Sequence, residues 1–311
     1  MDRKKIDPMK HYALLLMFSF FPLTLFADHL FEAGLRAGMA GYDAQCHYVL
    51  PVRGFHGGMQ ASYAYHSDYV IGLRIAATLD RSKAGFGKTD YNDTYSVIDV
   101  ENAPMQVDYS IGLLQEMYTI WSFGLPVQIG LSRNNISFYI GPKFVFPFHC
   151  RWSETAENAA LSVYYPQQDN RVYNSFPLAA SPSFQESQKG ESGVLPKIQY
   201  GLAAEICYDI PVYTGRRIKS YLCVGVYFDY SFSGVQDAAS ERVSLLMLSD
   251  TREGLPLHRI LTPVVRAQRQ GRRLVAERKP FDVGIKISYR IASYKPHQEA
   301  YRSCHCYINE Y

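Results

Sequence analysis

The 311-residue sequence lacks several features that would assign it to common protein classes. Six cysteines are too few for a small disulfide-built fold in a chain of this length. A formal net charge of +3 gives no support for nucleic-acid binding. Beyond the N-terminal segment, no run approaches the ~18 consecutive apolar residues of a helical membrane span. Tryptophan is scarce, with 2 residues against 25 tyrosines, and abundant tyrosine favours strands.

The first residues have the pattern of a secretory signal peptide. Basic residues between Arg3 and Lys10 precede the apolar stretch Tyr12–Phe26, and Ala27 supplies a small residue at the expected cleavage site. The apolar stretch is too short to span a membrane as a helix. We therefore expect residues 1–27 to be a cleaved signal peptide and the chain to be exported.

The clearest structural signal is a pair of alternating segments, Ser122–Ser132 and Ile136–Phe148, joined by Arg133-Asn134-Asn135. Side chains of a strand point alternately to opposite faces, so each segment has one apolar face and one polar or small face. Asparagine tolerates positive φ and suits the turn between them. The same period of two recurs in Phe31–Met39, Phe55–His66, Asp68–Asp80, Lys197–Ile210, Ser220–Phe232 and Phe281–Ile291. Together these segments predict eight strands.

The connections between these strands are alternately short and long. The long ones are Arg81–Met117, His149–Pro196 and Ser233–Lys279, and the alternating stretch Val107–Leu113 indicates that the fourth strand continues beyond the membrane. In an antiparallel up-and-down sheet, alternate connections lie at the same end, and this asymmetry is typical of outer-membrane barrels. We predict an all-β, eight-stranded antiparallel up-and-down transmembrane β-barrel over residues 28–291. Its short turns would be periplasmic, its long loops extracellular, and residues 292–311 a periplasmic tail.

A soluble barrel such as a lipocalin would show the same alternation with its faces exchanged. Here the polar face consists largely of glycine, alanine and serine, which suits a narrow lumen, and aromatic residues recur near the apolar strand ends. Charges of both signs lie in mid-strand on the polar face. We expect them to form a salt-bridge network that fills the lumen, although catalytic carboxylates or an ion path would use the same positions. The network residues are Glu32, Arg36, Arg74, Lys143, Glu205, Asp229, Lys286 and Arg290.

The stretches Ser122–Leu131 and Phe138–Lys143, with the strand topology, resemble the small outer-membrane β-barrels of Gram-negative bacteria. These are built like the eight-stranded OmpA membrane domain, and we expect no counterpart of OmpA's peptidoglycan-binding domain after the last strand. The closing strand is similar to the assembly signal of such barrels, with Asp282, Gly284, Ile287 and Tyr289 at its positions. The resemblance implies an outer-membrane monomer without cofactor that contacts lipid, lipopolysaccharide and the barrel insertion machinery.

Several other residues are candidates for catalytic, metal-binding or anion-binding sites. Asp80, His149 and His258 are rim candidates for a surface hydrolase, but no spacing ties a nucleophile to a base. Cys304-His305-Cys306 provides only half of a metal site, so we predict no metal. The basic segment Arg266–Lys279 would either grip lipopolysaccharide phosphates or remain a solvated loop.

Two cysteine pairs are candidates for disulfides. Cys207 and Cys223 are equidistant from Gly215 and both face the lumen, so we expect neighbouring thiols across one hairpin, with a bridge as an open alternative. Cys46 and Cys150 both fall near the extracellular rim and form a second candidate pair.

The function that the sequence favours is non-enzymatic: a barrel with a filled lumen that serves envelope integrity or surface interaction through its long loops. A narrow, porin-like channel for small solutes is the alternative, and a surface hydrolase comes third.

Overall fold

The computed structural model describes residues 28–66, 71–98, 103–133, 135–173, 184–191, 198–215, 218–233, 264, 267–269 and 272–293. Within these ranges, no helix is long and apolar enough to cross a membrane.

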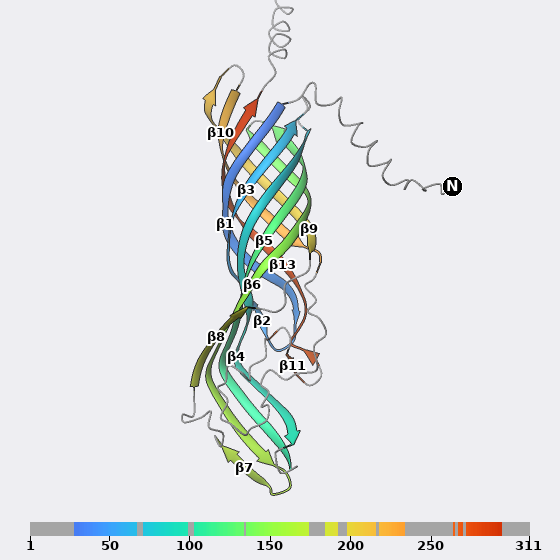
Figure 1. Cartoon of the computed structure of the whole chain (residues 1–311), viewed down its shortest axis with the longest axis vertical. Coiled ribbons are helices and arrows are strands. Elements are labelled where there is room, and N and C mark those ends of the chain that lie inside the picture. The colour runs from blue at the N-terminus through green and yellow to red at the C-terminus, as the bar shows by residue number, and fades with distance from the viewer. Residues whose placement is uncertain are drawn as a thin grey trace, which may run out of the picture.

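Eight strands close into a ring (Figure 1). Each strand pairs antiparallel with its neighbour in chain order, and the first closes the ring against the last. The prediction of an all-β, eight-stranded, antiparallel up-and-down barrel is therefore confirmed. The ring consists of β1 (Asp28–Cys46), β3 (Gly54–His66), β4 (Ile71–Ile98), β5 (Pro104–Arg133), β6 (Ile136–Tyr165), β9 (Gln199–Thr214), β10 (Ile218–Ser231) and β13 (Val275–Ser293).

The two faces of the ring have opposite chemistry. Apolar side chains point outward on every strand, and Leu35 and Ile129 expose 64% and 61% of their surface. Charged side chains point inward, and Arg74 and Lys286 are completely buried. Apolar groups normally leave water, so a continuous apolar outer surface around a charged interior reverses the arrangement of a soluble barrel. This is the orientation expected from the sequence.

One end of the barrel, here the turn end, carries short connections such as the one at Asn135, whose φ of 64° suits a tight turn. At the opposite loop end, β4, β5 and β6 continue beyond the ring as one long sheet (Figure 1). This extension comprises residues 83–98, 104–120 and 149–165. It is bordered by three short strands, β2 (Leu50–Val52), β7 (Asn170–Tyr173) and β8 (Phe184–Glu191).

The prediction that Arg81–Met117 is a loop with a short strand continuation is wrong. Strand β4 runs to Ile98 and β5 begins at Pro104, so nearly the whole segment is paired. The first part of His149–Pro196 belongs likewise to β6.

A row of extra residues explains why simple alternation did not reveal the extension. Asp90, Gly112 and Asn158 each fall out of the ladder at the same level of β4, β5 and β6, and Asp90 and Asn158 have φ values of 52° and 55°. Because each strand gains one residue there, the buried positions change from even numbers such as Leu114 to odd numbers such as Ile111. The same face stays buried while the period of two shifts its phase.

An apolar cluster closes the loop end of the barrel. Val264, Ala267 and Leu274 are completely buried against residues of the ring and the extension. The carboxylate of Glu116 accepts a hydrogen bond from the backbone N–H of Val264 at 2.7 Å, and the N–H of Leu274 donates to the carbonyl of Ala267 at 3.0 Å. Two short strands, β11 (Gln268–Arg269) and β12 (Arg272–Arg273), lie between these anchors.

Candidate functional site: the charged lumen

The interior of the barrel holds two layers of ion pairs. In the layer nearer the turn end, Glu205 on β9 accepts from Arg74 Nη1 at 2.7 Å and from Lys286 Nζ at 2.6 Å. Glu32 on β1 bonds Lys286 at 2.5 Å and Arg290 Nη2 at 2.9 Å. Glu205 therefore joins cations from two different strands, β4 and β13, whereas both of these cations of Glu32 lie on the neighbouring strand β13.

The turn-end layer is completed by Asp209. Arg290 Nη1 contacts its Oδ2 at 2.5 Å, and Ser137 Oγ donates to the same oxygen at 3.0 Å. The ring of Tyr139 lies 4.6 Å from the guanidinium carbon of Arg74, a cation–π distance. This layer contains three cations and three carboxylates (Arg74, Lys286 and Arg290; Glu32, Glu205 and Asp209), so its formal charge is balanced.

The second layer lies toward the loop end. Lys143 on β6 contacts Asp80 at 3.2 Å and Asp229 at 2.8 Å. Arg36 on β1 also bonds Asp229, and its Nη1 lies 3.7 Å from Asp80. His56 on β3 bridges between the layer and the wall: its Nδ1 shares a 2.5 Å hydrogen bond with the hydroxyl of Tyr227, and its Nε2 lies 3.4 Å from Asp80.

The structure brings all eight sequence-predicted lumen charges into these two layers. That predicted set holds five cations and three carboxylates, a formal charge of +2. Sequence reasoning missed Asp80 and Asp209, which bring the set to five carboxylates against five cations. It also missed Asp282, a further lumen-facing carboxylate beside Asp229. The formal charge of +2 in the predicted set indicates that carboxylates are missing, because buried charges are normally paired. All three residues lie at positions of their strands that alternate with the outward-facing ones, so the sequence could have identified them.

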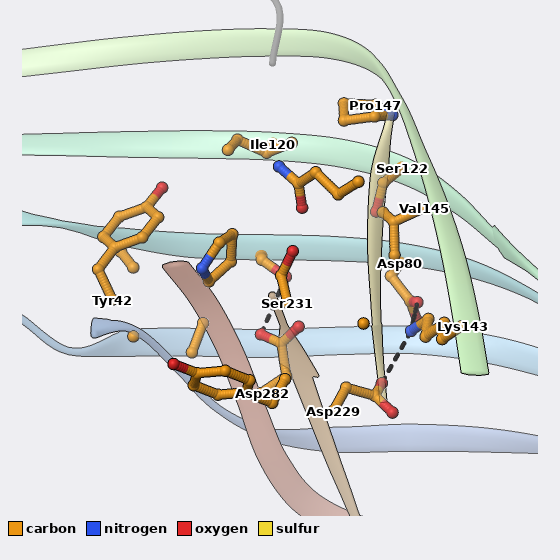
Figure 2. Close-up of a pocket in the computed structure, with 18 of the residues that line it drawn as sticks. Tyr42, Asp80, Ile120, Ser122, Lys143, Val145, Pro147, Asp229, Ser231 and Asp282 are labelled. Atoms are coloured by element: carbon orange, nitrogen blue, oxygen red, sulfur yellow. Dashed lines mark hydrogen bonds and ion pairs between the residues drawn. The ribbon is translucent and has the colours of Figure 1, made fainter. Parts of the chain in front are cut away.

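A cavity of about 60 Å³ lies between the loop-end layer and the apolar cluster (Figure 2). Asp80, Lys143 and Asp229 form its charged side, and Figure 2 shows Lys143 bonded to Asp229. Tyr42 and Ile120 form part of its apolar side. The lumen is therefore filled by two charge layers and an apolar layer, with one small space between the second and the third.

The hairpin cysteines are neighbours, as expected, but in a diagonal position. Cys223 pairs in register with Asp209, and Cys207 pairs with Gly225, so the two residues are two positions away from direct opposition. Both are free cysteines, so the alternative of a bridge is not formed here. The equal spacing from Gly215 does not give direct opposition, because Thr214 pairs with Lys219 and the centre of the hairpin lies further along the chain.

The second cysteine pair lies near the apolar cluster. Cys150 belongs to the cluster, and Cys46, a free thiol, packs against it. Burial raises the pKa of the Cys46 thiol to about 11. Cys46 is therefore a poor nucleophile at neutral pH.

The proposed assembly-signal residues lie on the closing strand β13. Ile287 and Tyr289 point outward with 54% and 47% exposure, whereas Asp282 and Gly284 lie on the inward face. As the last ring strand along the chain, β13 closes the ring by pairing with β1 as well as with β10.

Part of the basic segment Arg266–Lys279 is bound within the protein. Arg269 Nε lies 3.4 Å from Asp93 Oδ1, and its guanidinium stacks over the ring of Tyr48 at 4.5 Å. Arg278 is buried with its guanidinium 4.9 Å from the ring centre of Tyr118. Arg272 is exposed, so fewer cations are available to an external anion than the sequence suggested.

Two of the three rim candidates for a hydrolase lie within the described residues. Asp80 is bound within the loop-end layer, and His149 lies on β6 opposite Trp121 at the start of the extension. His258 lies outside the described residues, as do residues 1–27 and the Cys304-His305-Cys306 tail. Among the residues that are described, no three acidic, histidine or cysteine side chains are arranged to hold a metal ion.

Comparison with known proteins gave structural likenesses only. No protein-family model matches the chain, and no curated protein matches its sequence. Among solved structures, the chain is similar to Ail, the attachment invasion locus protein of Yersinia pestis, at 8% identity with a TM-score of 0.29, over 86% of this chain and 99% of that one. It is also similar to Neisserial surface protein A, at 10% identity with a TM-score of 0.25, over the same shares of the two chains.

These identities are too low to transfer a function, and the assignment of the fold stands on the strand pairings themselves. The chain is an eight-stranded up-and-down β-barrel. Its lumen contains a network of ion pairs, and the three-stranded extension continues beyond the ring.

Proposed function

We propose that the chain is a non-enzymatic outer-membrane β-barrel protein. The observation that carries this proposal is the apolar outer surface of all eight ring strands around a charged interior. A tilted strand needs about 9–11 residues to cross a membrane, and each ring strand exceeds that length. In water this surface would be an aggregation-prone patch, whereas against acyl chains it is the favourable arrangement.

The filled lumen supports a structural barrel over a channel. An eight-stranded ring is only wide enough for its side chains to fill, and here Arg74, Lys286 and Glu205 meet across it at ion-pair distances. A small-solute channel, the alternative, would require these buried pairs to separate, and breaking a buried pair by removing one partner typically costs about 3–5 kcal/mol.

The extension supports a role in surface interaction. It presents a polar face on which Arg171 pairs with Asp108 at 3.0 Å and Thr94 donates to Asp108 at 2.8 Å. In an outer-membrane orientation with the turn end periplasmic, this sheet would project from the cell. Exposed Arg272 and the barrel's outer surface would then contact lipopolysaccharide and lipid, and β13 would present the assembly signal to the insertion machinery.

The lumen proposal is tested by recording currents from the refolded barrel in planar bilayers. A filled lumen predicts no steady conductance. The matched variant is Arg74→Ala, which removes a completely buried side chain from the turn-end layer and should admit brief current steps. Steady conductance of the unaltered protein would favour the channel.

The surface role is tested by shortening the extension. Replacing residues 88–113 by a tight turn removes the tip of the β4–β5 hairpin and leaves the ring intact. If the role is surface interaction, cells with the shortened protein should keep normal detergent resistance but lose attachment to host-type surfaces. Loss of detergent resistance with unchanged attachment would instead assign the role to envelope integrity.

A further inference from the structure

The loop-end layer contains two carboxylates in direct contact positions on neighbouring strands. Asp229 on β10 pairs in register with Asp282 on β13, and both line the cavity. Asp229 is bonded to Arg36 and Lys143. Like charges directly opposite each other in a sheet are destabilising, so this pair needs a compensating charge.

Asp282 is bonded to no cation among the described residues, although His56 and Lys143 lie near enough to interact with it electrostatically. Its side-chain contact is a 3.2 Å hydrogen bond from Ser82 Oγ, and the cations of the layer are bonded to Asp80 and Asp229 instead. The layer thus sets three carboxylates (Asp80, Asp229 and Asp282) against two permanent cations (Arg36 and Lys143). With a neutral His56, one negative charge is in excess.

A second, independent observation lies on the cavity wall. Ser122 and Gln199 both line the cavity and are 8% and 6% exposed, and neither side chain has a hydrogen-bond partner among the described residues. Buried hydroxyl and amide groups normally find partners, so these two are placed for something inside the cavity. One water needs about 10–15 Å³. A space of about 60 Å³ therefore holds a small ion with part of its hydration shell.

We propose that this cavity binds one partly hydrated alkali cation beside Asp282 and Asp229. Ser122 and Gln199 would supply neutral oxygens to the ion and its waters. Because no three acidic, histidine or cysteine groups of the described chain are arranged around a common point, a tightly ligated divalent metal is not the expected occupant. The proposal concerns the lumen alone and does not depend on the surface role of the extension.

Protons compete with the cation, since protonation of Asp282 would remove the same excess charge. His56 is faced by charged and titratable groups from five strands, so it belongs to this balance rather than to an isolated site. These groups are Arg36 on β1, Asp80 on β4, Lys143 on β6, Tyr227 and Asp229 on β10, and Asp282 on β13. The stabilising effect of the cation should therefore fade as the solution becomes acidic.

The test measures the urea midpoint of the mature chain refolded into a non-ionic detergent, followed by tryptophan fluorescence. Refolding in vitro bypasses the insertion machinery, so a change at Asp282 is not confounded by its place in the assembly signal. Sodium and potassium chloride are compared with choline chloride at equal concentration. The midpoint should rise with the logarithm of sodium or potassium concentration above the dissociation constant and should not rise with choline.

Three variants complete the test. Asp282→Asn removes the excess charge and should abolish the difference between sodium and choline, whereas Gln199→Leu keeps every charge and should shift the dependence to higher concentration. Asp108→Asn removes a carboxylate from the exposed extension and should leave the dependence intact. An equal rise with choline, or a full sodium effect in Asp282→Asn, would overturn the proposal. A calcium effect that exceeds sodium at equal ionic strength would overturn the choice of an alkali ion.

Discussion

Replacing Glu205 by glutamine should be among the most destabilising conservative changes in the chain. Glu205 accepts from Arg74, Lys286 and Gln60 at 2.7, 2.6 and 3.0 Å, and it is buried. Glutamine keeps the shape but loses the charge that balances two buried cations. Removing one partner of a buried pair typically costs about 3–5 kcal/mol. Because Lys286 retains Glu32 at 2.5 Å and Arg74 retains it at 3.6 Å, we expect about 3 kcal/mol.

The assay is urea unfolding in detergent with a double-mutant cycle. Lys286→Met removes a cation of the same cluster, so the double variant with Glu205→Gln restores the balance of charges. The double variant should then cost about 2 kcal/mol less than the sum of the costs of the two single variants. The matched control is Asp108→Asn, which makes the same carboxylate-to-amide change in a pair whose side chains are 23% and 41% exposed. Exposed pairs contribute about 0–1 kcal/mol. If Glu205→Gln costs no more than this control, the lumen network does not stabilise the barrel as argued.

Three further predictions concern packing and reactivity. A Cβ on Gly38 would lie 2.1 Å from a backbone oxygen of β13, so Gly38→Val should prevent refolding. Ala37→Val, on the outward face, should be tolerated. Gel mobility before and after boiling measures the refolding of both variants. Leu274→Asp places a charge in the buried apolar cluster and should loosen it. Limited proteolysis should then cut near residues 264–278 while the ring stays intact. If the variant resists the protease as well as the unaltered protein does, the cluster is dispensable. Cys46, with its pKa raised to about 11, should react with iodoacetamide at least about tenfold more slowly at pH 8 than a thiol with the ordinary pKa of about 8.5, because its thiolate fraction is about two hundredfold smaller and the higher nucleophilicity of that thiolate offsets only part of the loss. The rate should increase toward alkaline pH, and a rate already at its plateau at pH 8 would contradict this.

The ring was predictable because two physical constraints repeat along the sequence. A strand that separates lipid from a charged lumen must alternate strictly, and segments such as Ser122–Ser132 and Ile136–Phe148 do so without interruption. Their pairing follows from the short Asn134-Asn135 connection, since a tight turn requires antiparallel neighbours. The same alternation places the charged side chains of those strands on the face that points into the lumen.

The extension was less predictable because both constraints weaken outside the ring. Its outer face is polar, so alternation there has low contrast, and the extra residues Asp90, Gly112 and Asn158 shift the phase in mid-strand. Asp80 was read as a rim residue because the expected strand ended at that position, whereas β4 continues to Ile98 and places Asp80 within the lumen. The register between Cys207 and Cys223 was not predictable either, because the sequence does not show how many residues the turn between β9 and β10 contains.

The account depends most on which face of the strands meets lipid. Nitroxide labels on single cysteines at Leu35 and Ile206, in a cysteine-free protein reconstituted into vesicles, measure this directly by their collision rates with oxygen and with a water-soluble nickel chelate. Both residues are outward-facing, at 64% and 49% exposure. High accessibility to oxygen with low accessibility to the nickel chelate is the predicted result. The reverse at both positions would mean that these side chains face water, and the outer-membrane barrel would be the wrong description.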